Sequence, residues 1–568
     1  MSASVDFSPI ESLVADLGEI EHSVDERILR AKSRDRFAQS PLLREVMRGL
    51  LADIYIAPTS KEELRTVVAS CARHRIPITI RGGGTGQFGQ GVPLTGGAVI
   101  DVTGIVGVVG QKFGTVRALC GTLITDIDAE IRPTGWELRM HPSTTRKATI
   151  GGFVAGGHAG IGSCQWGILR DRGNITAIEV MTVEEEPQLI ELIGDDVNIA
   201  HHAYGATGII TEVELPTAPA WKWQELIISF PEFSQAVRFS IDVCKSEGVL
   251  KKVVSPQQHP LPALYPDLAR FVPEGHSMVL MMAAEQSMPN VADLVADNGG
   301  EIRNRSEEEA GPYRLPLYEY TWGHSMMHFQ RKNRSLIGLL ALYPQDGLYE
   351  SIMKVCEEFA DLGPTHVEMK RFDGGLSAQG SPVWDFQSQE HLAEVTRRLQ
   401  EAGLVIANTH TPTLLASGMK PWAQAEAEFK RRVDPHRLLA QGKSDDEVED
   451  EVTLSTQLPN SGWSYSLTDS AAPAQTTAPV ETAASAQTLA PVAAVETVAP
   501  AETAATAQTA APAQTAAPAE IAAPAEIAAP AETAATIQTA PPGQTAPTAQ
   551  AVAPAEIAAP AQTVEQVR

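Results

Sequence analysis

The hydrophobic positions near the start of this chain predict a helix between two short strands. Within residues 64–71 the apolar side chains recur at i, i+3, i+4 and i+7, which predicts an amphipathic helix. Ser60 and Glu63 have the spacing of a capping box at the beginning of that helix. Short apolar runs at 54–56 and 76–80 precede and follow it. The pattern therefore predicts a β-α-β unit.

The same criteria predict further helices and strands up to about residue 300. We expect a helical lead over about 11–51, strands at 98–102, 175–183, 208–215, 226–230 and 278–282, and helices at 233–244 and 291–298. The order of these segments indicates a protein that mixes helices with strands.

The composition changes sharply in the last hundred residues. From 466 to 568 there is no aromatic residue, and Ala, Pro, Thr, Gln and Glu dominate, with near-repeats at 517–521, 523–527 and 553–557. Frequent proline prevents long helices, and too little large apolar surface is present to offset the entropy of ordering. We expect a disordered tail that acts as a solubilising spacer or binds a protein partner.

The net charge of −26 is distributed unevenly. From Ser444 onward there are fifteen acidic residues and one basic residue, so this part carries −14. The balance argues against a general nucleic-acid binder, because phosphate backbones require clustered Lys and Arg. Five widely spaced cysteines without a CxxC pair favour reduced thiols, and neither a signal peptide nor a long apolar run is found. We therefore expect a cytoplasmic protein without a transmembrane segment.

The run at 81–91, Arg-Gly-Gly-Gly-Thr-Gly-Gln-Phe-Gly-Gln-Gly, carries the strongest chemical signal. Glycine allows positive φ angles and a close approach of backbone N–H groups to a ligand, and successive N–H groups form an anion-binding nest. The run lies between two predicted strands, so a diphosphate site is expected. A Rossmann site is excluded because there the glycine turn opens a helix, whereas here a strand follows.

A second glycine cluster lies downstream. Pro142 and Ser143 precede Thr-Ile-Gly-Gly at 149–152, and Gly-Ile-Ile-Thr at 208–211 begins a predicted strand. The order of the first glycine run and these segments resembles the PCMH-type FAD-binding domain of the vanillyl-alcohol oxidase / p-cresol methylhydroxylase family. The resemblance covers about 47–219 and continues more weakly to 443.

This resemblance implies an α+β fold with four parts. They are a helical N-terminal lead at 1–46, a two-subdomain FAD-binding domain at 47–219, an α+β cap or substrate domain at 220–443 whose end returns to the FAD domain, and the disordered tail at 444–568. The segment 429–443 is similar to the family's closing motif. That motif usually has Asn-Pro where this chain has Ala440 and Gln441, which weakens an expected FAD contact of Lys443.

The resemblance also implies which residues bind FAD. The expected cofactor-binding residues are Arg81, Gly82, Gly83, Gly84, Thr85, Gly86, Gln87, Pro142, Ser143, Thr149, Gly151, Gly152 and Ile210. Covalent members often carry a linking histidine in the first glycine run, where this chain has Thr85 between glycines. We therefore expect non-covalent FAD, with His158 as the local competitor for attachment.

The implied activity is that of an FAD-linked oxidoreductase acting on CH–OH donors, with hydride transfer to flavin N5. Such a reaction needs a group that accepts the hydroxyl proton. His410 and His324 are the candidate catalytic bases, and Glu368 is a further candidate acid or base. Arg314, Lys370 and Arg371 are candidates for binding a substrate carboxylate.

Two alternatives to this function stay open. The first is a D-2-hydroxyacid dehydrogenase of the lactate or glycolate type with a diverged site. It is disfavoured because the His-rich, metal-binding signature of such enzymes is missing, and no metal site is expected. The second is a flavin-binding interaction protein without turnover. A small-molecule substrate and an electron acceptor, which would be O₂, a quinone or a redox protein, are the expected partners.

Overall fold

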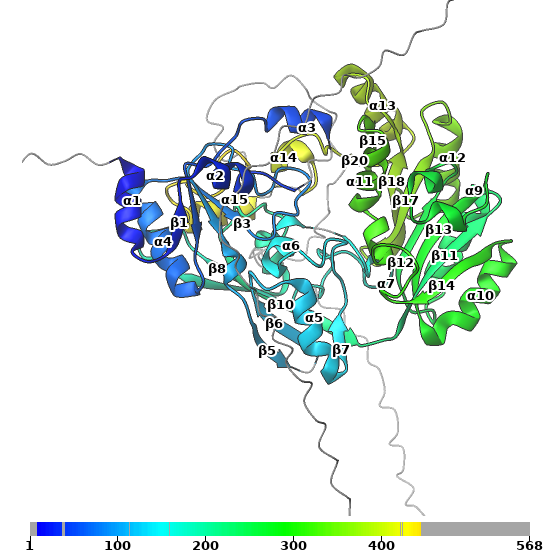
Figure 1. Cartoon of the computed structure of the whole chain (residues 1–568), viewed down its shortest axis with the longest axis horizontal. Helices are drawn as coiled ribbons and strands as arrows, with labels where there is room; N and C mark the ends of the chain where they lie inside the picture. The colour runs from blue at the N-terminus through cyan, green and yellow to red at the C-terminus, as the bar shows by residue number, and fades with distance from the viewer. Residues whose placement is uncertain are drawn as a thin grey trace, which may run out of the picture. The chain divides into compact units, whose positions relative to one another are not determined.

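A computed structural model of the chain describes residues 8–36, 40–112, 114–157, 159–420, 422 and 424–444. Their helices and strands form three main sheets with helices packed on them (Figure 1). The predicted tail at 444–568 lies outside these residues except for Ser444, and so does His158.

The first sheet contains the predicted β-α-β unit. Its four strands, in spatial order, are β1 (Glu21–Ser23), β2 (Ile54–Ala57), β4 (Ala98–Asp101) and β3 (Ile78–Arg81). Strands β2 and β3 both pair with β4 in parallel, and β1 is antiparallel to β2. The glycine run therefore leaves the carboxyl end of β3.

Helix α4 (Lys61–His74) connects β2 to β3 and begins where the sequence predicts it. The Ser60 hydroxyl accepts a hydrogen bond from the Glu63 N–H at 3.1 Å, as in a capping box. The Glu63 carboxylate accepts from the N–H of Thr59, at 2.7 Å, rather than from that of Ser60. Both predicted residues therefore accept hydrogen bonds from backbone N–H groups at the start of the helix, although Glu63 binds the residue before Ser60.

The N-terminal lead is less helical than expected. It contains the short helices α1 (Pro9–Leu17), α2 (Glu26–Lys32) and α3 (Pro41–Val46). Strand β1 interrupts them because residues 21–23 pair with the edge of β2 and satisfy its backbone hydrogen-bonding groups. Local periodicity did not reveal this pairing, which depends on a strand thirty residues away.

The second sheet is antiparallel and is built around the long strand β10. Its strands are β5 (Val108–Lys112), β6 (Thr115–Leu119), β10 (Ile209–Pro219), β8 (Ala177–Met181) and β9 (Leu189–Ile193), with β7 (Trp136–Leu138) also paired to β10. Helices α5 (Ile124–Ile131), α6 (Ile150–Gly156), α7 (Ser163–Trp166) and α8 (Val197–Ala200) complete this region. Apolar side chains of the first and second sheets belong to one continuous core.

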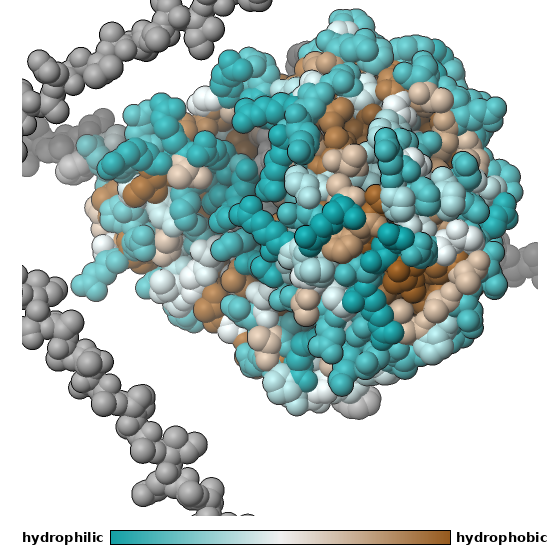
Figure 2. Space-filling view, turned by 45° about the vertical axis from the view of Figure 1, so that its right-hand side comes forward, coloured by the Kyte–Doolittle hydropathy of each residue, from teal (hydrophilic) through white to brown (hydrophobic). Residues whose placement is uncertain are grey.

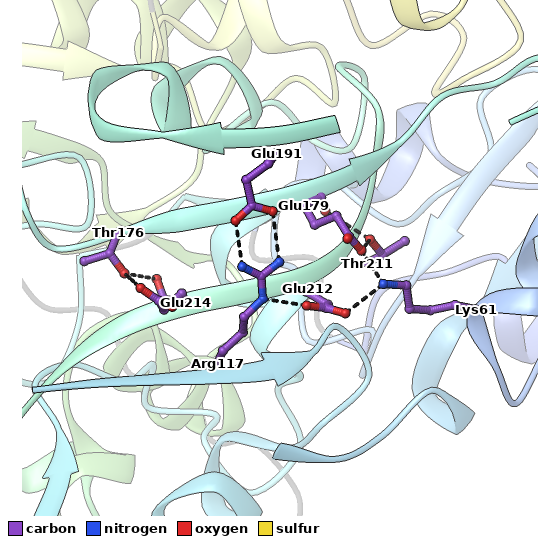
Figure 3. A network of polar contacts seen from close by, with 8 residues as sticks. All are labelled: Lys61, Arg117, Thr176, Glu179, Glu191, Thr211, Glu212 and Glu214. Carbon is purple, nitrogen blue, oxygen red and sulfur yellow. Dashed lines mark hydrogen bonds and ion pairs between the residues drawn. The ribbon is translucent and has the colours of Figure 1, made fainter. Parts of the chain in front are cut away.

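A polar network joins these two sheets (Figure 3). Lys61, at the start of α4, forms ion pairs with Glu179 of β8 and with Glu212 of β10. Arg117 of β6 contacts Glu212 at 2.5 Å and holds Glu191 with two hydrogen bonds of 2.6 and 2.9 Å. Burial alone would raise the pKa of Glu212, but the hydrogen bonds from Lys61 and Arg117 outweigh it and lower the pKa. The network therefore stabilises one arrangement of the two sheets.

The third sheet has eight antiparallel strands and begins after β10. In spatial order they are β14 (Glu301–Glu307), β11 (Trp223–Phe230), β13 (Ser277–Ala284), β12 (Lys251–Gln257), β17 (Thr365–Phe372), β18 (Gly375–Pro382), β16 (Leu340–Leu342) and β20 (Val405–Ala407). Alternate residues of β13 enter two different cores: Val279 and Met281 enter one, and Met278 and Leu280 enter the other. This period of two is what an antiparallel strand buried on both faces requires.

Helices cover both faces of the third sheet. The first core is closed by α9 (Phe233–Lys245), α10 (Met288–Asp297), α12 (Leu348–Glu358) and α13 (Gln389–Glu401). The second core includes α11 (Gly323–Lys332). A two-stranded sheet of β15 (Leu336–Ile337) and β19 (Trp384–Asp385) lies beside them. The expected α+β class is confirmed, while the exact domain limits stay predictions.

The C-terminal part of the described chain returns to the first sheet. After α14 (Leu414–Ser417) and α15 (Gln424–Val433), Leu439 forms a parallel bridge with Ile78 of β3. In Figure 1 these yellow helices lie among the blue N-terminal elements. The return places Lys443 against the glycine run, as described below.

The face of the described chain drawn in Figure 2 is mostly hydrophilic. Teal side chains cover most of the face drawn in Figure 2, and hydrophobic residues appear there in separate patches. Within the described ranges, no helix has both the length and the apolar character needed to span a bilayer. All five cysteines are free thiols, and four of them are buried.

Candidate functional site

A cavity lies where the three sheets meet. It encloses about 1360 Å³, part of which is open to solvent. Its walls come from the glycine run after β3, the 142–160 segment, the start of β10 and one edge of the third sheet. All thirteen residues expected to bind a cofactor line it.

The glycine run presents backbone donors to this cavity. In the part of the chain that the structure describes, the N–H groups of residues 83–87 meet no protein acceptor. Gly84 has a φ of 61°, a left-handed conformation that glycine adopts without strain. Consecutive N–H groups without protein partners form a site for an anion such as a diphosphate. The donor set thus fits the expected cofactor.

The two glycine-rich segments pack closely against each other. A Cβ at Gly82 would lie 2.3 Å from the Thr149 hydroxyl oxygen, and one at Gly83 would lie 1.8 Å from the Lys147 carbonyl oxygen. The Thr149 hydroxyl accepts a hydrogen bond from the Gly152 N–H at the start of α6. Side chains at these glycines would force the two walls of the cavity apart.

Two buried ionisable residues hold the end of the glycine run in place. The Lys443 ammonium donates to the carbonyls of Gly89, at 2.7 Å, and Gln90. The Asp35 carboxylate accepts from the Gly89 N–H at 2.9 Å. Burial lowers the pKa of Lys443 to about 7, and the negative charge of Asp35 opposes that shift. Lys443 therefore stabilises the conformation of the glycine run, and this role does not depend on which residues contact the ligand.

Another wall of the cavity is formed by Trp322 and Gly323 at the start of α11 and by Leu340 and Gln379 of the third sheet. A Cβ at Gly323 would lie 2.3 Å from the Gln87 side-chain oxygen, so the glycine run touches this wall directly. Trp322 has a φ of 55°, and its N–H donates to the Glu368 carboxylate at 2.5 Å. A non-glycine residue held in this conformation is strained, and such strain is concentrated at functional sites.

A side pocket opens from this part of the cavity. It shares five lining residues with the cavity, namely Gly156, Ala159, Trp322, Leu340 and Gln379. It also contains two cationic side chains, Arg170 and Lys370, and two histidines, His201 and His202. Arg170 follows α7 and Lys370 belongs to β17, so the pocket lies between distant parts of the sequence. Its cationic character suits an anionic small molecule.

Lys370 is almost completely buried in this pocket, with 2% of its surface exposed. Its ammonium donates a 2.6 Å hydrogen bond to the Gln379 side-chain oxygen. Burial lowers the pKa of Lys370 to about 7; nearby Arg170 lowers it further and Asp171 opposes the shift. A lysine of this pKa exists in both protonation states near neutral pH and can act as an acid or a base.

Neither histidine expected to be catalytic lies on the cavity wall. The His410 ring contacts the Ser40 hydroxyl at 2.6 Å, and the His324 ring lies 3.8 Å from the Glu319 carboxylate. Burial lowers the pKa of each to about 4. Both rings are therefore neutral at pH 7. Their catalytic role stays a prediction, one that the arrangement of the cavity does not favour.

The other predicted site residues, which are the acid or base candidate and the carboxylate-binding candidates, lie in different environments. Glu368 is buried and accepts hydrogen bonds from Ser255 and Trp322, while its carboxylate lies 2.9 Å from His366. Arg314 is exposed and lies outside the cavity lining. Arg371 pairs with Glu247 beside α9. Of the three predicted carboxylate-binding residues, the structure brings only Lys370 to the side pocket.

Several lining residues were not anticipated as site residues. Trp322, Gln379 and Tyr204 carry no local motif, and only the third dimension brings them to the cavity. Arg170 follows the second glycine cluster directly, a position that could have drawn attention to it. His202 and Tyr204 have positive φ values of 54° and 52°, which sequence alone does not reveal for such residues. In the described ranges, no group of three or more His, Cys, Asp or Glu side chains is arranged to hold a metal.

Comparisons with known proteins agree on the nature of this region. A family model described as an FAD binding domain matches residues 52–187. The chain is 30% identical over 183 residues to D-lactate dehydrogenase of Anaerostipes hadrus, an overlap of 30% of this chain and 37% of that protein. It is 27% identical over 208 residues to D-2-hydroxyglutarate dehydrogenase of Pseudomonas putida, or 33% of this chain and 20% of that protein.

The fold resembles that of a third kind of protein over a greater length. A solved structure of alkyldihydroxyacetonephosphate synthase matches 76% of this chain and 84% of its own chain, with a TM-score of 0.55 and 15% identity. The sequence matches, in contrast, span well under two thirds of the two dehydrogenases named above. The sequence similarity to the two dehydrogenases is therefore partial, whereas the similarity of fold extends over most of the described chain.

Proposed function

Because residues 52–187 of this chain form an FAD binding domain of the PCMH type, we propose that the protein is an FAD-dependent oxidoreductase that oxidises a small 2-hydroxy acid. The sequence relatives named for D-lactate and D-2-hydroxyglutarate support this class of substrate. The observation that carries the proposal is the cationic side pocket that opens from the cofactor cavity.

Arg170 is the proposed anchor of the substrate carboxylate. Its guanidinium lies in the side pocket, and one of its nitrogens donates to the Met419 carbonyl at 3.2 Å. A planar guanidinium with several donors suits bidentate recognition of a carboxylate. Trp322 and Leu340 reach both the pocket and the cavity, so they shield the reacting carbon from water.

Lys370 is the proposed acceptor of the hydroxyl proton. Oxidation of a hydroxyl-bearing carbon releases a hydride and a proton, and bound FAD supplies the acceptor for the hydride. A neutral Lys370 amine can donate one N–H to Gln379 while its lone pair takes the proton. Its pKa of about 7 suits this exchange, whereas a pKa of about 4 makes His324 and His410 weak bases at neutral pH.

The proposed cofactor contacts follow from the cavity walls. The N–H groups of residues 83–87 would bind the diphosphate, and Pro142, Ser143, Thr149, Gly151, Gly152 and Ile210 would line the remainder of FAD. Thr85 stands where a linking histidine would be expected in covalent relatives. We therefore propose that FAD is bound without a covalent link. The electron acceptor is proposed to be O₂, a quinone or a redox protein.

Anaerobic reduction of the bound flavin tests this function. The purified protein, loaded with FAD, is mixed with a panel of D- and L-2-hydroxy acids, with simple alcohols and with sugars. We expect hydroxy acids of one configuration to bleach the flavin and the matching neutral alcohols to leave it oxidised. Bleaching by neutral alcohols alone would refute the carboxylate requirement. A yellow protein that no donor reduces would support a flavin-binding module without turnover.

A further inference from the structure

The N-terminal elements form a second concave surface, which we call the basic groove. It is open to solvent, encloses about 2040 Å³ and includes residues of 30–36 and 44–51 together with Arg81, Gly82 and Gly83. Seven of its side chains are cationic and two are acidic; the cations are Arg30, Lys32, Arg34, Arg36, Arg44, Arg48 and Arg81. Such a concentration stands out in a chain of net charge −26.

Four cations of the basic groove form no ion pair with a described residue, and all of them except the buried Arg81 are exposed. Arg30 and Arg48 pair with Glu26 and Glu45 on the surface, and Lys32 pairs with the buried Asp101. Arg34, Arg36 and Arg44 are exposed and form no ion pair with any residue that the structure describes. Partial burial, and then the charge of the neighbouring Arg334, lower the pKa of Arg44. An anionic occupant would offset the repulsion among the unpaired cations of the groove.

The described chain ends beside this groove. The Lys443 ammonium is held by the Gly89 and Gln90 carbonyls, and the following residue, Ser444, is buried. Met47, which lines the groove, lies against the same Gly89, since a Cβ there would be 2.7 Å from its sulfur atom. Helices α3 and α14, which come from the two ends of the described chain, also appear close together in Figure 1. The last described residue, Ser444, therefore lies close to the wall of the groove.

Those residues have the complementary charge. Asp-Asp-Glu-Val-Glu-Asp-Glu at 445–451 carries six carboxylates in seven residues. Seven extended residues span up to about 24 Å. A tethered segment also binds at a high effective concentration, because attachment removes most of the entropy of association. We propose that the acidic run at 445–451 binds in the basic groove of its own chain, opposite Arg34, Arg36 and Arg44.

The proposal is independent of the catalytic activity. It rests on the charge of the groove, on the point where Ser444 lies and on the composition of the following run. An acidic partner protein is the competing occupant, but such a partner would first have to displace a segment that is attached close to the groove wall. The groove is continuous with Gly82 and Gly83, so its occupant would also cover the outer side of the glycine run.

Distances between two spin labels test the proposal on the full chain. The labels are placed at Ala31→Cys in the groove and Val448→Cys in the acidic run, two uncharged positions, in a Cys356→Ser background. The remaining native cysteines are buried. At about 0.01 M salt, where the screening length is about 30 Å, we expect a narrow distribution of distances. At about 1 M salt, where it is about 3 Å, the distribution should broaden.

Charge variants provide the matched comparison. The triple variant Arg34→Gln, Arg36→Gln and Arg44→Gln should broaden the low-salt distribution. The triple variant Arg303→Gln, Lys354→Gln and Arg397→Gln removes the same charge from the third-sheet region and should leave it narrow. A distribution that is broad at low salt, or unaffected by the groove variant, would overturn the proposal and leave the groove to an acidic partner protein.

Discussion

The Lys370 ammonium on β17 lies 2.6 Å from the side-chain oxygen of Gln379 on the neighbouring strand β18. Gln379 lines the cofactor cavity and the side pocket, so this hydrogen bond orients the lysine at the junction of the two. The pair thus connects the place expected for the flavin with the place proposed for the substrate carboxylate. It provides the most direct tests of the proposed chemistry.

Replacing Lys370 should remove the pH dependence of flavin reduction near neutrality. The base must be neutral to accept a proton, and its pKa is about 7, so the wild-type rate should rise as the pH increases through 7 and then level off. Lys370→Met should lower the limiting rate by about 10²- to 10⁴-fold and abolish that rise. Anaerobic stopped-flow absorbance across the pH range measures both quantities.

The same measurement on His324→Gln and His410→Gln serves as the comparison. Because the pKa of each ring is about 4, neither variant should shift the rise near pH 7. Loss of that rise in one histidine variant, with Lys370→Met unaffected, would assign the base to the histidine and contradict the role of Lys370.

Replacing Arg170 should weaken substrate binding more than the chemical step. A hydrogen bond to a charged group contributes about 1.5–3 kcal/mol, so Arg170→Met should raise the apparent Kd for a hydroxy acid by roughly 10- to 100-fold. Arg170→Lys should recover part of the affinity, because it keeps the charge but loses the planar fork. Titration of flavin reduction gives the affinity. Unchanged affinity in Arg170→Met would place the carboxylate elsewhere.

Gly83→Ala should reduce FAD binding without unfolding the protein. The added Cβ would lie 1.8 Å from the Lys147 carbonyl, so the two walls of the cavity must separate. We expect at least about a tenfold loss in FAD affinity, a change of about 1.4 kcal/mol. Gly110→Ala is the matched control, because a Cβ there meets nothing within 4 Å. Flavin absorbance per protein measures occupancy and circular dichroism checks the fold; full occupancy in Gly83→Ala would disprove the close-packing argument.

Lys61→Met should destabilise the junction of the first two sheets. It leaves Glu179 and Glu212 without a shared cation, and we expect a loss of about 2 kcal/mol at neutral pH. The folded-state pKa of Glu212 is lowered, so its stabilising contribution is present above its unfolded pKa and lost as the pH falls through the folded value. The difference between wild type and Lys61→Met should therefore shrink in acid.

Hydrogen exchange of β8 and β10 at several pH values measures the effect of Lys61→Met locally. Arg397→Met, which removes only exposed contacts on α13, should change little. A difference that grows as the pH falls would be inconsistent with the network as described.

Acid precipitation should release the flavin from the protein. Non-covalent FAD would stay in the supernatant and leave a colourless pellet. His158→Ala is the informative variant, since His158 is the competing attachment point and lies outside the described residues. Yellow colour retained in the wild-type pellet and lost in that variant would establish a covalent link.

Local sequence determined the parts of this protein whose conformation depends on near neighbours. The period of 64–71 and the Ser60 cap define α4, and short apolar runs mark β11 and β13. The glycine run predicted an anion site because glycine itself permits positive φ angles and closely spaced N–H groups. The pairing of β1 with β2 was missed, since it depends on a partner distant in the chain.

The proposed reactive centre depended on the tertiary structure. Arg170 and Lys370 are two hundred positions apart, and neither belongs to a motif that predicts their meeting in one pocket. The pKa of Lys370 is near neutrality only because the folded chain removes water from its ammonium, and desolvation by burial is a property of the whole surroundings. The sequence by itself thus predicted which loop would bind an FAD diphosphate, and only the fold decided which side chains line the pocket proposed for the substrate.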